Sequence, residues 1–209
     1  MKRAELTRGF SLIEMLYWLT YGSFTTYLVA FVTDARGGSA SVAGLMLALF
    51  MASACVGHIF FGSLCDRRQN NRSVFMATLT GIIVIQLGVY FAPNMILLGV
   101  GYVCLGFIQP PTSALMDTWL IRSFPDDPGA YSPIRALASL AYAVLMLVMG
   151  WTIEHIGHWM MPVLSTCFAV AGILVARSMP EIPVWRATPA NPSPRSACAR
   201  SRPWCGCSS

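Results

Sequence analysis

The stretch VFMATLTGIIVIQLGVYFA, residues 74–92, contains no charged side chain and is long enough to cross a lipid bilayer. A helix needs about 20 mostly apolar residues to span the hydrocarbon core, because each residue lengthens it by about 1.5 Å. In lipid the backbone must satisfy its own polar groups, and a helix does so within a single segment. Residues 74–92 therefore predict a transmembrane helix.

The same pattern recurs along most of the chain. Of the 209 residues, 56% are hydrophobic and only 11% are charged, whereas a typical soluble domain is about 25% charged. The predicted spans are Leu12–Val32, Ala40–Phe61, Val74–Ala92, Met95–Ile121, Ile134–Ile153 and Trp159–Val175. Short connections make consecutive helices antiparallel neighbours. The sequence thus predicts an all-α membrane protein with six transmembrane helices.

Basic residues are distributed unevenly between the two sides of the predicted bundle. If the N-terminus is cytoplasmic, Arg36 is the only one of the 14 Lys and Arg residues on the outer side. Cytoplasmic segments typically carry such an excess. We therefore expect a protein of the inner (plasma) membrane with both termini in the cytoplasm. The net charge of +5 follows from this topology and gives no reason to expect a nucleic-acid partner.

An alternative interpretation of the first span is a secretory signal peptide. Its basic N-terminal flank fits that interpretation. Its apolar stretch is longer than the usual 7–15 or so residues, and five further spans follow it. We therefore favour a transmembrane helix.

The most specific motif follows the second span and reads GSLCDRRQNNR, residues 62–72. Glycine permits close approach of two backbones, and an aspartate can pair with an arginine or accept hydrogen bonds from a helix N-terminus. The residues that carry the motif are Gly62, Leu64, Asp66, Arg67, Arg68 and Arg72. Taken alone, this stretch is also compatible with an ordinary basic loop between two spans.

Three charged side chains lie within predicted spans, where a charge is costly and usually faces a cavity or a partner. Asp117 and Arg135 lie near the adjoining ends of consecutive helices, so they could pair, or both could extend to the membrane surface. Glu14 shares a stripe at helical spacing with Trp18 and Tyr21. It could carry a proton, or it could lie among the lipid headgroups.

Two further features are typical of transporters. Gln109 and the Pro110-Pro111 pair indicate a cavity beside the fourth span, although paired prolines can also form a packed kink. The segments GSLCD at 62–66 and GWTIE at 150–154 both place a glycine four residues before an acid. Because they would lie on opposite sides of the membrane, they suggest that three helices are followed by three of opposite orientation, a 3+3 inverted repeat.

Residues 62–72 resemble the signature loop of the major facilitator superfamily, with Gln69 in place of the family's second glycine. Tyr21-Gly22 and YSPIRALASLAY at 131–142 resemble its oligosaccharide/nucleoside–proton symporter branch. In that branch an acid near the end of helix 4 pairs with an arginine early in helix 5. Asp117 and Arg135 occupy those places here. The resemblance covers residues from about 10 to 182.

The resemblance implies two six-helix halves around a central site, of which this chain supplies the N-terminal half. It implies proton-coupled transport of a small polar solute that is sugar- or nucleoside-like. Asp117 and Arg135 are the residues that the resemblance places at the site, and together with Glu14, Tyr21 and Gln109 they are the candidate substrate or coupling residues. The partner would be a second half in cis, in trans or as a homodimer. A truncated, non-transporting membrane fragment and a membrane interaction module are the alternatives.

Patterns of enzymes and metal sites are weak or absent in the sequence. It contains no phosphate loop, no dinucleotide fingerprint and no Gly-x-Ser-x-Gly context for a serine nucleophile. His58, His155 and His158 lie near span ends on opposite sides, and Cys205 and Cys207 form a C-x-C pair without nearby histidines. We expect no enzyme activity, cofactor or metal site.

Residues 183–209 differ from the rest in composition. They are rich in Arg, Pro, Ser and Cys and contain no acidic residue. Such a segment cannot bury enough apolar surface to fold alone. We therefore predict a six-helix bundle over residues 1–182 and a disordered tail over 183–209. The tail could be a normal cytoplasmic tail, a loop leading to further helices, or an aberrant out-of-frame end.

Overall fold

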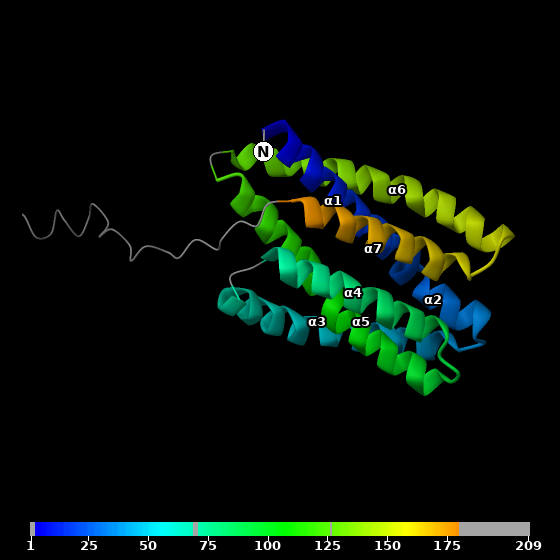
Figure 1. The fold of residues 1–209 in the computed structure, drawn as a ribbon. Helices are drawn as coiled ribbons and strands as arrows, with labels where there is room; N and C mark the ends of the chain where they lie inside the picture. Colours follow the sequence, from blue (N-terminus) through cyan, green and yellow to red (C-terminus); the bar gives the residue numbers. More distant parts are fainter. Residues whose placement is uncertain (1–2, 69–70, 126, 180–209) are drawn as a thin grey trace, which may run out of the picture.

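The computed structural model describes residues 3–68, 71–125 and 127–179, and every long element in this part of the chain is a helix (Figure 1). The long helices are α1 (Arg3–Phe24), α3 (Ala40–Arg68), α4 (Asn71–Tyr90), α5 (Met95–Ser123), α6 (Tyr131–His155) and α7 (Met160–Ser178). They run side by side, and the start of α1 and the end of α7 lie at the same end of the bundle. We call it the N-terminal end, and the opposite one the far end.

Five of these helices are long and apolar enough to cross a membrane. They are α4, α5, α6, α7 and residues Ala40–Cys65 of α3. Each corresponds to one predicted span, with boundaries that differ by only a few residues. These five predictions are therefore confirmed as apolar helices of membrane-spanning length.

The prediction of one uninterrupted helix over Leu12–Val32 is wrong. The α-helix begins at Arg3 and ends at Phe24. Three short elements continue the path: a 3-10 turn η1 (Thr25–Tyr27), α2 (Leu28–Ala30) and a π turn η2 (Phe31–Ala35). In the π turn the N–H of Arg36 donates to the carbonyl of Phe31, five residues back. Such wide turns are rare and often mark functional positions.

α1 is more polar than the other long helices, and its position in the bundle explains why. It packs against both α6 and α7 and also touches α5. Its buried side chains include Glu14, Thr20 and Ser23. A helix enclosed by other helices needs no wide apolar surface toward lipid, so hydropathy alone does not identify it as a span.

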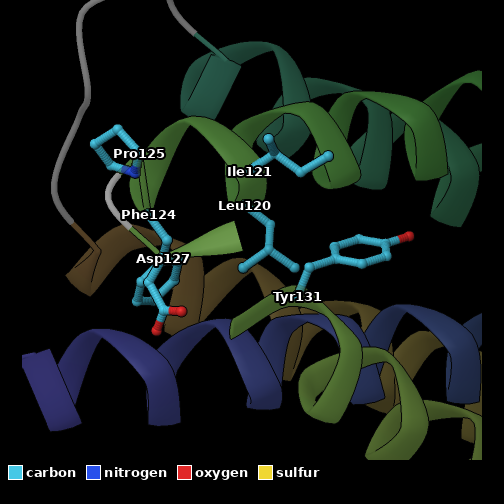
Figure 2. Close-up of a pocket in the computed structure, with 6 residues that line it drawn as sticks. All are labelled: Leu120, Ile121, Phe124, Pro125, Asp127 and Tyr131. Carbon is cyan, nitrogen blue, oxygen red and sulfur yellow. The ribbon is translucent and has the colours of Figure 1, made fainter. Parts of the chain in front are cut away.

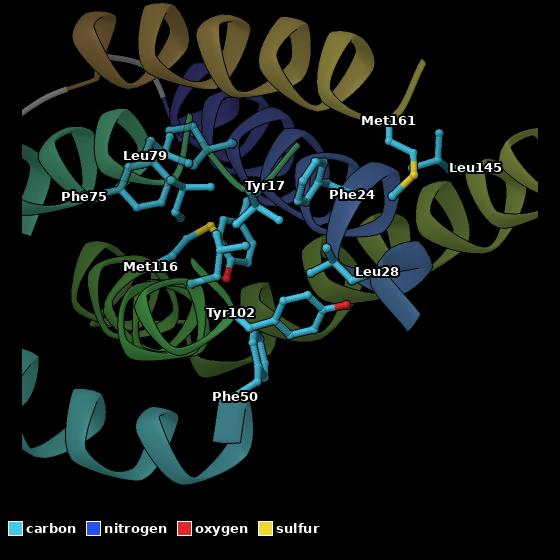
Figure 3. Packing of buried hydrophobic residues seen from close by; sticks show 14 of the residues in the cluster. Tyr17, Phe24, Leu28, Phe50, Phe75, Leu79, Tyr102, Met116, Leu145 and Met161 are labelled. Carbon is cyan, nitrogen blue, oxygen red and sulfur yellow. The ribbon is translucent and has the colours of Figure 1, made fainter. Parts of the chain in front are cut away.

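The long helices form two groups of three. α1 packs with α6 and α7, α5 packs with α3 and α4, and the groups meet mainly where α4 contacts α7. Figure 3 shows the apolar core, to which Tyr17 and Phe24 of α1, Phe75 of α4 and Met116 of α5 contribute. This core holds α1 in the interior, and with it the polar side chains that α1 carries.

α3 and α5 approach each other closely because each presents a glycine to the backbone of the other. A Cβ atom on Gly57 would collide with the carbonyl of Phe107, and one on Gly106 would collide with the carbonyl of Phe50. Pro110-Pro111 does not break α5, which continues to Ser123. In an α-helix the carbonyl of Phe107 would accept a hydrogen bond from the N–H of residue 111. Because Pro111 has no N–H, this hydrogen bond is absent. That carbonyl lies at the contact with α3.

The predicted loop between the second and third spans is largely helical. α3 continues to Arg68 and α4 begins at Asn71, so most of the expected loop over 65–73 belongs to the two helices. Leucine and arginine are good helix formers, and no proline interrupts this stretch. The predicted tail, residues 183–209, lies outside the described residues.

Candidate functional site

A single arginine on α6 joins two carboxylates from two other helices. Arg135 Nη1 lies 2.9 Å from Asp117 Oδ1 of α5 and 3.3 Å from Glu14 Oε1 of α1. We call Glu14, Asp117 and Arg135 the charge cluster. The sequence suggested that Asp117 and Arg135 could meet, and it treated Glu14 as a separate candidate. The fold brings all three together because α1 packs against α6 and also touches α5.

Trp18 encloses the charge cluster on one side. Its indole Nε1–H donates to Glu14 Oε2 at 3.1 Å, and the Arg135 guanidinium lies over its ring, 4.8 Å from the centroid. The same ring therefore orients the acid and attracts the base. Sequence reasoning noticed Trp18 on the stripe of α1 but did not select it as a site residue. Its position four residues after Glu14 was the available signal.

The three charged side chains differ in their access to solvent. Glu14 is fully buried, whereas the side chains of Asp117 and Arg135 are 24% and 31% exposed. The cluster is therefore closed toward the core and open on the side of α5 and α6. With all three groups ionised, two negative charges would face one positive charge.

Gln109 of α5 is hydrogen-bonded to α1 and η1 at a position farther toward the far end than the charge cluster. Its backbone carbonyl accepts a hydrogen bond from Tyr17 Oη at 2.6 Å, and its side-chain oxygen accepts one from Thr25 Oγ1 at 2.5 Å. The side chain of Gln109 is fully buried, and its Nε2 has no partner within the described residues. Tyr21 makes no ion pair or hydrogen bond to the charge cluster among the contacts of the described residues, but its ring packs against that of Trp18, with the centroids 5.6 Å apart.

A cavity of about 260 Å³ lies farther along the bundle, toward the far end. Its walls come from α1 to α2, α3, α5 and α6, and its polar lining consists of hydroxyl groups. They belong to Tyr21, Thr25, Thr26, Tyr102 and Tyr142. We call it the hydroxyl cavity.

The sequence matches the family model of the Major Facilitator Superfamily over residues 10–206. The chain belongs to the major facilitator superfamily. This confirms the resemblance inferred from residues 62–72, and it places the chain in a family of transporters rather than in a family of enzymes. A search of curated proteins gave no match.

Solved structures of a transporter share the fold. The crystal structure of nucleoside transporter NupG matches with a TM-score of 0.77 and 15% identity, covering 85% of this chain and 45% of that one. A point mutant of NupG matches with a TM-score of 0.79 and 15% identity, covering 94% and 51%. The chain therefore spans about half the length of the structures it matches. At this identity the likeness concerns the fold alone.

The residues predicted to form the signature loop begin at the N-terminal end of the bundle. Gly62 and Leu64 belong to the last turns of α3. Arg72, in the first turn of α4, donates from Nη1 to the backbone carbonyl of Met179 at 3.0 Å and so ties α4 to the end of α7. The side chains of Asp66, Arg67 and Arg68 lie outside the described part of the chain.

A second cavity, of about 280 Å³, lies at the N-terminal end between the last turn of α5 and the start of α6 (Figure 2). Leu120, Ile121 and Phe124 make most of its wall apolar. Its one charged lining residue, Asp127, points toward α1 and pairs with Arg3. Asp127 and the hydroxyl-bearing Tyr131 are the polar residues in its otherwise apolar lining.

Metal-binding side chains do not gather in the described residues. Over 3–68, 71–125 and 127–179, no group of three or more His, Cys, Asp or Glu side chains could hold a metal ion. The C-x-C pair at Cys205 and Cys207 falls outside these ranges. The candidate functional site is therefore the charge cluster, in which a fully buried carboxylate shares one guanidinium with a second carboxylate.

Proposed function

We propose that this chain is the N-terminal six-helix half of a permease that moves a small polar solute, sugar- or nucleoside-like, together with a proton. The observation that carries the proposal is the sharing of Arg135 between Glu14 and Asp117. Charged groups inside a membrane protein are costly and typically mark substrate or proton pathways. The similarity in fold to a nucleoside transporter supports this class of solute.

Glu14 is the group we propose to carry the proton. It is fully buried, and its distance to Arg135 is longer than that of Asp117. Protonation of Glu14 would remove the excess negative charge and leave one carboxylate for one guanidinium. Arg135, with five N–H donors, could then offer free donors to the solute. In this way proton binding and solute binding would favour each other.

The pattern of helix contacts supports a 3+3 inverted repeat. If α1, α3 and α4 correspond to α5, α6 and α7, the contact of α1 with α6 corresponds to that of α5 with α3. The contact of α1 with α7 likewise corresponds to that of α5 with α4. Such repeats place the solute site where they meet.

α3 and α6, which correspond under this repeat, are the least buried of the five apolar helices. Ile59 on α3 and Leu147 on α6 are 78% and 80% exposed. We propose that these surfaces face lipid and a second six-helix half, supplied in cis, in trans or as a homodimer. The excess of Lys and Arg supports an inner-membrane location with cytoplasmic termini.

Uptake of labelled uridine and methyl β-D-galactoside into vesicles containing the full chain tests the proposal. We expect an inward proton gradient to drive uptake and Glu14→Gln to make it independent of the gradient. Asp117→Asn and Arg135→Ala should abolish uptake, because each removes a partner within the cluster. Asp127→Asn is the matched control, since it removes a carboxylate from an exposed ion pair with Arg3.

Three results would contradict parts of this proposal. Gradient-driven uptake that persists in Glu14→Gln removes Glu14 as the proton carrier. Unchanged uptake in Asp117→Asn and Arg135→Ala removes the charge cluster from transport. No uptake of either solute by the unmodified chain contradicts transport of these solutes by this chain alone.

A further inference from the structure

We propose that the cavity of about 280 Å³ at the N-terminal end, between the last turn of α5 and the start of α6, binds the side chain of Trp185 from the same chain. We call it the apolar cavity. Trp185 belongs to residues 180–209, which lie outside the described part of the chain. The binding itself does not depend on the proposed function, whereas its consequence for transport does.

The apolar cavity has the size and the lining that suit one aromatic side chain. Its volume is just below the ~300–1,000 Å³ of drug-sized sites. Leu120 and Ile121 form an apolar wall, and the ring of Tyr131 lies beside Leu120 (Figure 2). Phe124 adds a second ring to the lining. Aromatic side chains attract one another beyond the effect of the apolar area they bury, so this lining favours an aromatic occupant.

Trp185 is the aromatic side chain closest in sequence to the end of the described residues. Residues 180–209 contain two aromatic side chains, Trp185 and Trp204, and no Leu, Ile, Val or Met lies between them. A tryptophan exposed to water presents a large apolar area, and its burial is favourable. The chain therefore offers a suitable occupant only a few residues beyond Met179.

The connecting segment is long enough to reach the apolar cavity. The described residues end at Met179, whose side chain lies so close to Gly9 of α1 that a Cβ atom there would collide with it. The neighbouring Phe10 packs against Phe124 of the cavity, with ring centroids 6.0 Å apart. One helix, about 10–12 Å in diameter, thus separates Met179 from the cavity. Residues 180–185 can span about 20 Å when extended.

A tryptophan in the apolar cavity would limit access to the charge cluster. Ile121 lies four residues after Asp117, and Tyr131 lies four residues before Arg135. The cavity therefore begins about one helical turn from the charge cluster, on the side of the N-terminal end. Asp117 and Arg135 are the partly exposed members of the cluster. Bound Trp185 would shield them from this end and so act as an autoinhibitory contact.

Trypsin digestion of the full chain, with one chain in each lipid nanodisc, tests the binding. Mass spectrometry gives the rates of cleavage after Arg186 and after Arg195. Arg186 directly follows Trp185, whereas Arg195 lies nine residues farther along the chain and serves as the internal control. Because cleavage follows the population of the unbound form, we expect it to be at least about tenfold slower after Arg186.

Two substitutions, each with a matched control, identify the source of the protection. Trp185→Ala should raise the cleavage rate at Arg186 to that at Arg195, and Trp204→Ala should change neither rate. Ile121→Gln, which places a polar group in the wall of the cavity, should also remove the protection. Its control is Ile96→Gln at the other end of α5. Ile121 and Ile96 are 57% and 81% exposed, so neither substitution disturbs the core.

Three results would overturn the proposal. Equal cleavage after Arg186 and Arg195 in the unmodified chain would do so, as expected if a lipid acyl chain fills the cavity instead. Protection that persists in Trp185→Ala would show that the bilayer, and not the cavity, shields Arg186. Protection seen only with two chains in each nanodisc would assign the cavity to a second copy. The digestion requires neither solute nor proton gradient, so failure of the proposed transport would leave its result unaffected.

Discussion

Two helix pairs in this bundle are built in opposite ways. α3 and α5 meet through Gly57 and Gly106, each of which contacts the backbone of the other helix, with no room for a side chain. α1 and the turn η1 that follows it meet α6 through polar bonds, among them Arg135 with Glu14 and the hydrogen bond that Tyr27 Oη of η1 donates to the Met146 carbonyl at 2.8 Å. Under the proposed repeat these two pairs occupy equivalent places.

The difference assigns different tasks to the two contacts. A close contact of backbones contains nothing that can exchange with a proton or a solute, so it fixes the position of its helices. Ion pairs and hydroxyl bonds can exchange their partners for water, protons or ligand groups. We therefore place structural rigidity at the α3–α5 contact and function at the α1–α6 contact. Three substitutions test what the groups at each contact contribute to stability.

The largest effect is expected from Arg135→Gln. It leaves the fully buried Glu14 without its cation, and breaking a buried pair in this way typically costs about 3–5 kcal/mol of stability. Denaturant unfolding followed by circular dichroism in detergent would measure the loss. Adding Glu14→Gln should restore most of it, because the uncompensated charge disappears.

The exposed pair of Arg3 and Asp127 supplies the control for that experiment. Its side chains are 70% and 37% exposed, so Arg3→Gln should cost no more than about 1 kcal/mol. Equal losses in Arg3→Gln and Arg135→Gln would show that burial of the charge cluster has no energetic consequence.

A smaller loss is expected from Gly106→Ala. The added Cβ would collide with the carbonyl of Phe50 and push α3 away from α5, at about 1–3 kcal/mol. Gly88→Ala is the matched control in α4, where a Cβ meets nothing within 4 Å and alanine favours the helix. A melting temperature that falls equally in both variants would contradict close packing as the cause.

The smallest effect is expected from Trp18→Phe. It keeps an aromatic face beneath Arg135 but loses the N–H that donates to Glu14, a hydrogen bond to a charged group that contributes about 1.5 kcal/mol. Trp159→Phe is the control, because its indole N–H bonds only to the exposed carbonyl of Ile156. The same unfolding assay measures both, and no difference between them would argue against Trp18 as a positioning residue.

The helices could be predicted where the chain faces lipid, and the prediction failed where it does not. Long apolar runs identified five helices, because a lipid-facing surface must be apolar throughout. The first span is enclosed by α6 and α7, so its hydropathy is weak and its boundaries were misplaced. The turns at Thr25–Ala35 have no sequence signature, because hydrogen bonds to other helices contribute to their form.

For the candidate site, the sequence by itself determined the kinds of groups present and the side of the bundle on which they lie. Charges within apolar runs are rare enough to identify Glu14, Asp117 and Arg135 without a structure. Only the tertiary structure decided that one guanidinium serves both acids, that Trp18 holds them, and that Tyr102 faces a cavity without a partner. Spacing along a helix fixes its faces, whereas the rotation and approach of neighbouring helices depend on packing along their entire length.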